Sequence, residues 1–235
     1  MPLAVEICVQ DPAGARTALE QGATRVELCS ALEVGGLTPS RATIESVRAL
    51  TAHPGWLNVL VRPRPGGYVY SPAEIDLTCA DVAHAVAAGA DGVVVGALTA
   101  TGGVATAHLR AVLDAAQGRT VTFHRAFDVI EDRRAALDVL VDLGVDRVLT
   151  SCGRSRAVDA LPELAALARA AAGRVQLMAG GGVRPEDVPA LAAAGCDAVH
   201  LSARQRAEGG QGGQGTAWRT DPSTVAAAAR TAAVL

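Results

Sequence analysis

Several segments of the chain alternate apolar residues with residues whose side chains can do chemistry. In Arg25–Cys29 the side chains of Glu27 and Cys29 share one face of a strand, because strands have a period of two. Carboxylates and imidazoles transfer protons, and thiolates and imidazoles bind metal ions. The same alternation in other segments adds further side chains to that face: Glu6, Cys8, Arg62, His124, Gln176 and His200.

The acidic and imidazole residues of this set point to acid–base chemistry. Glu6 or Glu27 would act as a general base or as a ligand of a divalent metal ion, and His124 and His200 would transfer protons. Schiff-base chemistry on lysine is excluded, because the chain contains no lysine. A purely structural alternative is that the charged groups form internal ion pairs, with Glu27 joined to Arg62 and Glu6 to His200.

Candidate substrate-binding residues follow the strands on loops. Arg62 and Arg64 belong to a rigid loop rich in proline and glycine, where two guanidinium groups could hold an anionic or sugar-like substrate. The alternative is a stiff surface loop. Arg125 and Asp128 either contribute to the same site or form a pair that fixes their own loop.

The glycine-rich run Ala179–Val183 follows a later strand. Backbone N–H groups of Gly181 and Gly182 are suited to binding a substrate phosphate, as in many barrels. The usual partner of such a loop is a second glycine-rich loop after the next strand. Here that strand leads into His200–Arg204 instead, so the prediction for Gly181 and Gly182 is of substrate binding in general.

Two thiols, those of Cys8 and Cys29, point to the same side on neighbouring predicted strands. Thiolates are soft ligands that suit Cu(I) or Zn(II), and the alternative is that both are small core residues. The chain has five cysteines, an odd number at wide spacings without a CxxC motif. This pattern predicts free thiols in a reducing cytoplasm.

The elements that must position these residues alternate along the whole chain. A phrase of glycine, small residue, Asp or Thr, any residue and valine recurs at 22–26, 89–93, 144–148 and 195–199. Each copy closes a helix and starts the next strand. We predict strands at Val5–Val9, Arg25–Cys29, Asn58–Arg62, Gly92–Gly96, Thr120–His124, Arg147–Ser151, Val175–Ala179 and Ala198–Ser202. The predicted helices are Ala13–Gln21, Ser40–Thr51, Glu74–Ala88, Thr106–Ala116, Arg133–Leu143, Ala157–Ala172, Glu186–Ala194 and Ser223–Val234.

Eight such units of similar size favour a closed (β/α)8 TIM barrel over an open doubly wound sheet. We expect one domain over 1–235, with a flexible Gly/Gln-rich loop at about 205–217. The net charge of -3 without a basic block argues against a nucleic-acid partner. No apolar run is long enough to span a membrane. In a barrel, the polar residues would meet at the carboxyl ends of the strands, where active sites lie.

The motifs run in order through nearly the whole chain and resemble the CutC family, the copper homeostasis proteins. The matching residues are Val5–Cys8, Arg25–Cys29, Gly35–Ser40, Arg62–Arg64, Tyr70–Ser71, Thr122–Asp128, Leu149–Ser151, Ala179–Gly182, His200 and Ser202–Ala203. The resemblance implies a TIM barrel and a cytoplasmic homodimer that binds or traffics Cu(I). It assigns Cys8 and Cys29 as the Cu(I) ligands and adds Ser151 and Ser202 to the substrate-binding candidates.

Two functions are therefore predicted. The first is copper homeostasis through Cu(I) binding, as the resemblance implies. The alternative is a TIM-barrel enzyme of isomerase, epimerase or lyase type, which would act on an anionic or sugar-like small molecule at the mouth of the barrel.

Overall fold

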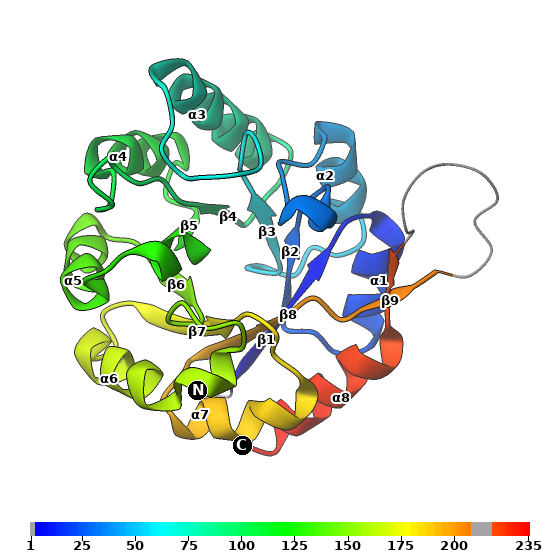
Figure 1. The fold of residues 1–235 in the computed structure, drawn as a ribbon. Helices are drawn as coiled ribbons and strands as arrows, with labels where there is room; N and C mark the ends of the chain where they lie inside the picture. The colour runs from blue at the N-terminus through cyan, green and yellow to red at the C-terminus, as the bar shows by residue number, and fades with distance from the viewer. Residues whose placement is uncertain (1–2, 208–217) are drawn as a thin grey trace.

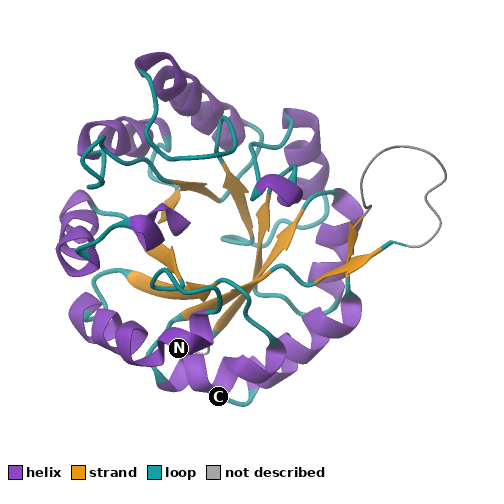
Figure 2. Ribbon diagram, in the orientation of Figure 1, coloured by secondary structure: helices purple, strands orange, loops and turns teal. Residues whose placement is uncertain are grey.

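Eight parallel strands close into a barrel in the order β1 to β8, and the helices lie outside it (Figures 1 and 2). The computed structural model describes residues 3–207 and 218–235. Closure leaves no free edge among these strands. This architecture confirms the predicted TIM barrel. The strands are β1 (Ala4–Val9), β2 (Arg25–Leu28), β3 (Leu57–Leu60), β4 (Gly92–Val95), β5 (Thr120–Phe123), β6 (Arg147–Thr150), β7 (Gln176–Gly180) and β8 (Ala198–Leu201).

Each predicted helix is present: the helix at Arg133–Leu143 has the predicted bounds, and the ends of the others differ by at most a few residues. The predicted helices at 157–172 and 186–194 both have 3₁₀ turns at their starts, η3 (Ala157–Ala160) and η4 (Pro185–Asp187). Two more 3₁₀ turns, η1 (Leu32–Val34) and η2 (Arg125–Val129), follow β2 and β5. The α-helices are α1 (Pro12–Glu20), α2 (Arg41–Arg48), α3 (Pro72–Ala87), α4 (Thr106–Ala115), α5 (Arg133–Leu143), α6 (Leu161–Ala171), α7 (Val188–Ala193) and α8 (Pro222–Ala233). No helix among the described residues combines the length and apolarity needed to cross a membrane.

The repeated phrase forms a clamp between neighbouring strands. Its third residue accepts a hydrogen bond on its side chain from a backbone N–H near the start of the preceding strand, and its own N–H donates to the carbonyl of that same residue. Four such clamps therefore join β1 to β2, β3 to β4, β5 to β6 and β7 to β8 at the amino ends of the strands. The pairs are Thr24 with Val5, Asp91 with Leu57, Asp146 with Val121, and Asp197 with Leu177.

The two faces of the strands differ as the alternation predicts. Outward residues such as Ile7, Leu28 and Phe123 are fully buried against the helices and form the main apolar core. Inward residues include Glu6, Glu27 and others that are charged or polar yet buried. Because an unpaired buried charge is costly, the partners of these inward groups determine what the barrel interior can do.

A short antiparallel hairpin follows β8 and was not predicted. It consists of β9 (Arg204–Arg206) and β10 (Trp218–Thr220), and the guanidinium of Arg204 lies 4.8 Å from the centre of the Trp218 ring. The predicted flexible loop at 205–217 therefore begins within a strand, and its residues 208–217 lie outside the described part of the chain.

We predict that Asp146→Ala lowers the free energy of unfolding by about 1–3 kcal/mol, because it leaves the N–H of Val121 without its 2.7 Å carboxylate acceptor. Urea denaturation followed by circular dichroism measures the loss. Asp142→Ala, at an exposed position of α5, is the matched control and should change stability by less than about 0.5 kcal/mol. Equal effects of the two substitutions would show that the clamp does not stabilise the barrel.

Candidate functional site

A cavity of about 760 Å³ opens at the carboxyl ends of the barrel strands. This is the face on which TIM-barrel enzymes carry their active sites. Most of the residues predicted from sequence lie in its wall: Cys8, Glu27, Arg62, His124, Arg125, Asp128, Gly181, Gly182, His200 and Ser202. The wall that the described residues form does not include Glu6, Cys29, Arg64 or Ser151.

A thiol, a carboxylate and an imidazole converge in this cavity. Cys8, Glu27 and His200 offer one ligand atom each, and these three atoms all lie within 4.8 Å of one another. The Cys8 thiol donates a hydrogen bond of 3.2 Å to Glu27 Oε2, and His200 Nε2 lies 3.8 Å from the same oxygen. The three side chains come from β1, β2 and β8, which are adjacent because β1 pairs with both other strands. Such a group can hold a metal ion or transfer protons.

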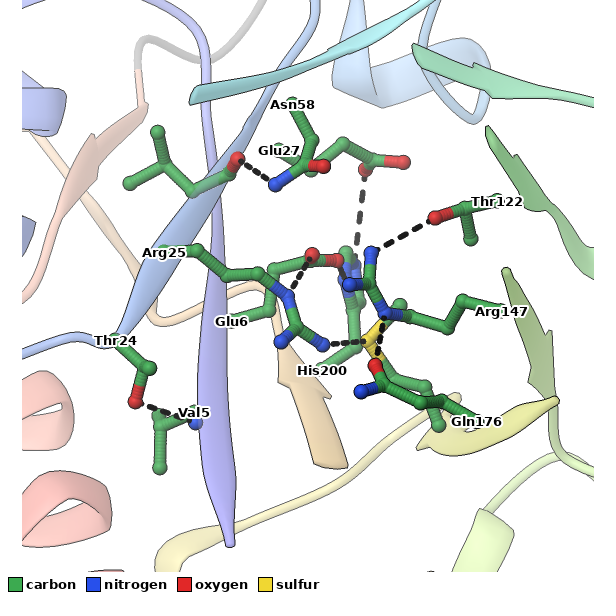
Figure 3. A network of polar contacts seen from close by, with 12 residues as sticks. Val5, Glu6, Thr24, Arg25, Glu27, Asn58, Thr122, Arg147, Gln176 and His200 are labelled. Atoms are coloured by element: carbon green, nitrogen blue, oxygen red, sulfur yellow. Dashed lines mark hydrogen bonds and ion pairs between the residues drawn. The ribbon is translucent and has the colours of Figure 1, made fainter. Parts of the chain in front are cut away.

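Glu6 lies beneath this group and orients the imidazole. Its Oε1 is 2.8 Å from Nδ1 of His200, and its Oε2 accepts a 2.7 Å hydrogen bond from Nε of Arg25. Figure 3 shows the carboxylate of Glu6 between these two partners. The predicted Glu6–His200 pair is thus confirmed, and it turns the other ring nitrogen toward Glu27.

Two arginines enter the barrel interior from opposite sides, as Figure 3 shows. Arg25 holds Glu6 and also donates to the sulfur of Met178 at 3.2 Å. Arg147 donates to Thr122 Oγ1 at 2.9 Å and to Gln176 Oε1 at 3.1 Å. Burial, together with the charge of Arg25, lowers the pKa of Arg147 to about 10.

These two arginines were missed in the sequence, although the period of two places Arg25 on the same face as Glu27. Each begins its strand directly after a turn, where an arginine would ordinarily extend into solvent.

The buried contacts move the pKa values of the group in opposite directions. Burial raises the pKa of Glu6, but Arg25 and His200 outweigh it and bring that pKa well below the ordinary value. Burial lowers the pKa of His200, but its contacts with Cys8 and Glu6 raise it well above the ordinary value. Burial also raises the pKa of Glu27. At neutral pH the metal-free site therefore holds an imidazolium beside an ionised Glu6.

The thiol of Cys8 stays protonated in the same state. Its contact with Cys29 and its burial raise the pKa of Cys8 well above the ordinary value. The two sulfur atoms lie 3.5 Å apart, and Cys29 is fully buried behind Cys8, with its thiol directed to the carbonyl of Val9. The structure therefore brings the two predicted Cu(I) ligands together, and of the two it places Cys8 in the cavity wall.

Arg125, Asp128 and Ser151 form a network that fixes the loops after β5 and β6. Asp128 accepts hydrogen bonds from Arg125 Nε at 2.7 Å, from Thr150 Oγ1 at 2.6 Å and from the backbone N–H of Ser151 at 2.9 Å. Arg125 also donates to Ser151 Oγ at 2.9 Å. The alternative prediction of a loop-fixing pair at Arg125 and Asp128 is therefore the one this geometry favours.

The two predicted anion-binding arginines have different surroundings. The structural alternative paired Arg62 with Glu27. In the structure, Arg62 instead donates hydrogen bonds to the backbone carbonyls of Val34, Gly36 and Gly66. Arg62 still lines the cavity.

Arg64 turns away from the cavity. It pairs with Glu74 in the first turn of α3, and its guanidinium lies 4.9 Å from the centre of the Tyr70 ring. Sequence spacing could not reveal this partner, because the two residues belong to different elements.

The shifted pKa of His200 makes stability depend on pH. A group whose pKa is raised by folding contributes stability below its unfolded value, about 6.5 for histidine, and loses that contribution as the pH rises through the folded pKa. For the metal-free protein we therefore predict that His200→Gln costs about 1–3 kcal/mol at low pH and less at high pH. Urea unfolding between about pH 6 and pH 9 measures this, with the exposed His53→Gln as the control. A cost that does not change with pH would contradict the assignment.

Comparisons with known proteins agree on one family. The model of the CutC family matches residues 3–205. The family protein CutC of Bacteroides fragilis is 40% identical over 206 residues, which are 87% of this chain and 82% of that protein. The protein of the same name from Xylella fastidiosa is 45% identical over 201 residues, which are 85% of this chain and 74% of that protein.

Comparison with solved structures indicates the same family. The crystal structure of CutC from Streptococcus agalactiae, described as a candidate copper homeostasis protein, has a TM-score of 0.79 and 33% identity, and the match covers 86% of this chain and 99% of that one. The aldolase QR15 has a TM-score of 0.63 at 16% identity, over 84% of this chain and 89% of that one, and shares the fold alone. The barrel, the motifs and the relatives together show that this chain belongs to the CutC family.

Proposed function

We propose that the protein binds a copper ion at the mouth of the barrel, as a cargo that it buffers or passes on. The observation that carries the proposal is the convergence of Cys8, Glu27 and His200 in the cavity wall. Thiolate and imidazole are ligands that copper favours. Glu6 supports the site as carboxylates often support metal-bound histidines, since it binds the ring nitrogen that faces away from the group.

The oxidation state of the ion decides which donors take part. Cu(I) is soft and favours thiolates, so Cys29, 3.5 Å behind Cys8, would supply the second sulfur. A divalent ion is better matched by the mixed set of Cys8, Glu27 and His200. Either set requires the Cys8 thiol to lose its proton, so affinity should rise with pH.

We predict that Cys8→Ser weakens copper binding by more than about 100-fold, because both donor sets contain this sulfur, and that Glu6→Gln weakens it by about 10–100-fold. Competition with a chelator, run separately for Cu(I) and Cu(II), gives the affinities. Cys29→Ser should weaken Cu(I) binding alone. The half-buried Cys79 lies on α3, and Cys79→Ser is the matched control without effect. Copper affinity unchanged in Cys8→Ser would overturn the proposal.

We further propose that the protein works in the cytoplasm as a homodimer. Free thiols at all five cysteines suit a reducing compartment. The dimer rests on the family resemblance alone, and light scattering of the purified protein tests it.

A second function, catalysis on a small molecule, is favoured by the size of the cavity. A volume of about 760 Å³ falls in the range of sites that enclose small molecules and is far more than one ion needs. In this proposal the protein is an isomerase, epimerase or lyase for an anionic or sugar-like molecule.

In such an isomerisation, Glu27 would take a proton from a carbon beside a carbonyl group. The electrons of the broken C–H bond would form a carbon–carbon double bond, and the carbonyl π electrons would move to its oxygen. If the carbon that loses its proton also carries a hydroxyl group, the proton of that hydroxyl would pass to the former carbonyl oxygen through His200 Nε2. Return of the first proton from Glu27 to the former carbonyl carbon would then complete the isomerisation, with both residues restored and no other reactant.

A further inference from the structure

One imidazole in the cavity wall has no role in the metal site. His124 directly follows β5 and is 6% exposed, and its Nε2 has no hydrogen-bond partner among the described residues. A buried polar nitrogen without a partner is unfavourable, which makes such an atom uncommon in a folded protein. Nε2 of His124 is thus unsatisfied within the described part of the protein, at a residue that lines the cavity.

The other ring nitrogen shows what kind of partner is missing. Nδ1 of His124 accepts a 3.1 Å hydrogen bond from the backbone N–H of Ala126, at the start of η2. An accepting Nδ1 carries no proton, so the neutral ring carries its proton on Nε2. Burial and the charge of Arg62 lower the pKa of His124 to about 3, which keeps the ring neutral. The unpartnered atom is thus a hydrogen-bond donor, and it needs an acceptor.

The fold holds this ring in place. A Cβ atom at Gly96 would lie 2.3 Å from Nδ1 of His124, so only glycine at that position leaves room for the ring. The Tyr68 ring packs on it with centroids 5.1 Å apart. Gly96 has no left-handed backbone angle that would by itself require glycine. The space it leaves therefore serves the position of the imidazole.

The surroundings of the donor are cationic. The guanidinium of Arg62 lies over the same Tyr68 ring, 5.4 Å from its centre, and Nε of Arg62 also lacks a partner within the described residues. Three carbonyl oxygens hold the remaining nitrogens of Arg62, so its charge is fixed at this wall. An oxygen atom bearing negative charge is the acceptor that matches a neutral N–H donor beside a fixed cation.

We propose that His124 donates a hydrogen bond from Nε2 to a carboxylate or carbonyl oxygen of a small organic anion in the cavity, with Arg62 supplying the neighbouring positive charge. This inference names a substrate class for the enzymatic function proposed above and rests on it. A neutral imidazole in this role stabilises negative charge on the oxygen without giving up its proton. The residue thus binds and polarises the ligand rather than transferring protons, which is a different role from the one the sequence suggested.

Pyruvate is a suitable probe because it carries both kinds of oxygen. In metal-free protein with ¹⁵N-labelled histidine, we expect the Nε2–H resonance of His124 to shift and saturate as pyruvate is added. His124→Phe keeps a planar ring without the donor and should weaken pyruvate binding roughly tenfold or more. His124→Gln restores an N–H donor and should recover most of the affinity. Gly96→Ala, which displaces the ring without touching the ligand, should resemble His124→Phe.

Two controls separate this proposal from the others. His108→Phe alters another buried imidazole with unpartnered nitrogens, in a separate small cavity, and should leave pyruvate binding unchanged. His124→Phe should keep the copper affinity of the wild type, so a loss of pyruvate binding in this variant is distinct from a failure of the copper site. The absence of a saturable His124 shift, or equal pyruvate affinity in His124→Phe and wild type, overturns the inference.

Discussion

The buried carboxylate of Glu6 is the constraint on which the rest of the barrel interior depends. A fully buried charge is tolerated only with partners, and Arg25 and His200 are those partners. Through them, one carboxylate fixes the orientation of the imidazole above it and the position of the guanidinium below it. The group in the cavity wall is therefore built on the Glu6–Arg25 ion pair, and neither of these two residues lines the cavity that the described residues form.

The cavity then has two walls of different chemistry. On β1, β2 and β8, His200, Glu27 and the thiol of Cys8 form a set suited to proton transfer or, after Cys8 and Nε2 of His200 lose their protons, to a metal ion. After β3 and β5, the fixed charge of Arg62 and the neutral His124 are suited to oxygen atoms of an anion. Two histidines of one barrel thus have pKa values shifted in opposite directions, as often occurs where environments assign distinct roles to like residues.

The barrel could be predicted from sequence because its signals are local. Alternation along each strand and the recurring glycine phrase depend on neighbouring residues, so they gave the strands, the helices and the inward positions of Glu6, Glu27 and His200. The roles of the polar residues could not be obtained in this way, because a partner is chosen in space. Arg64 pairs with Glu74, and Asp128 accepts hydrogen bonds from Arg125, Thr150 and Ser151. The β9–β10 hairpin escaped prediction because its strands have three residues each and are far apart in sequence.

The four clamps of the repeated phrase lie at the end of the barrel opposite to the cavity. The residues that hold the strands in register are therefore different from the residues that line the cavity. A barrel arranged in this way can exchange the loops of its mouth while its strand register is retained. Such a scaffold is open to divergence, and to redesign, at the face where new ligands would be recognised.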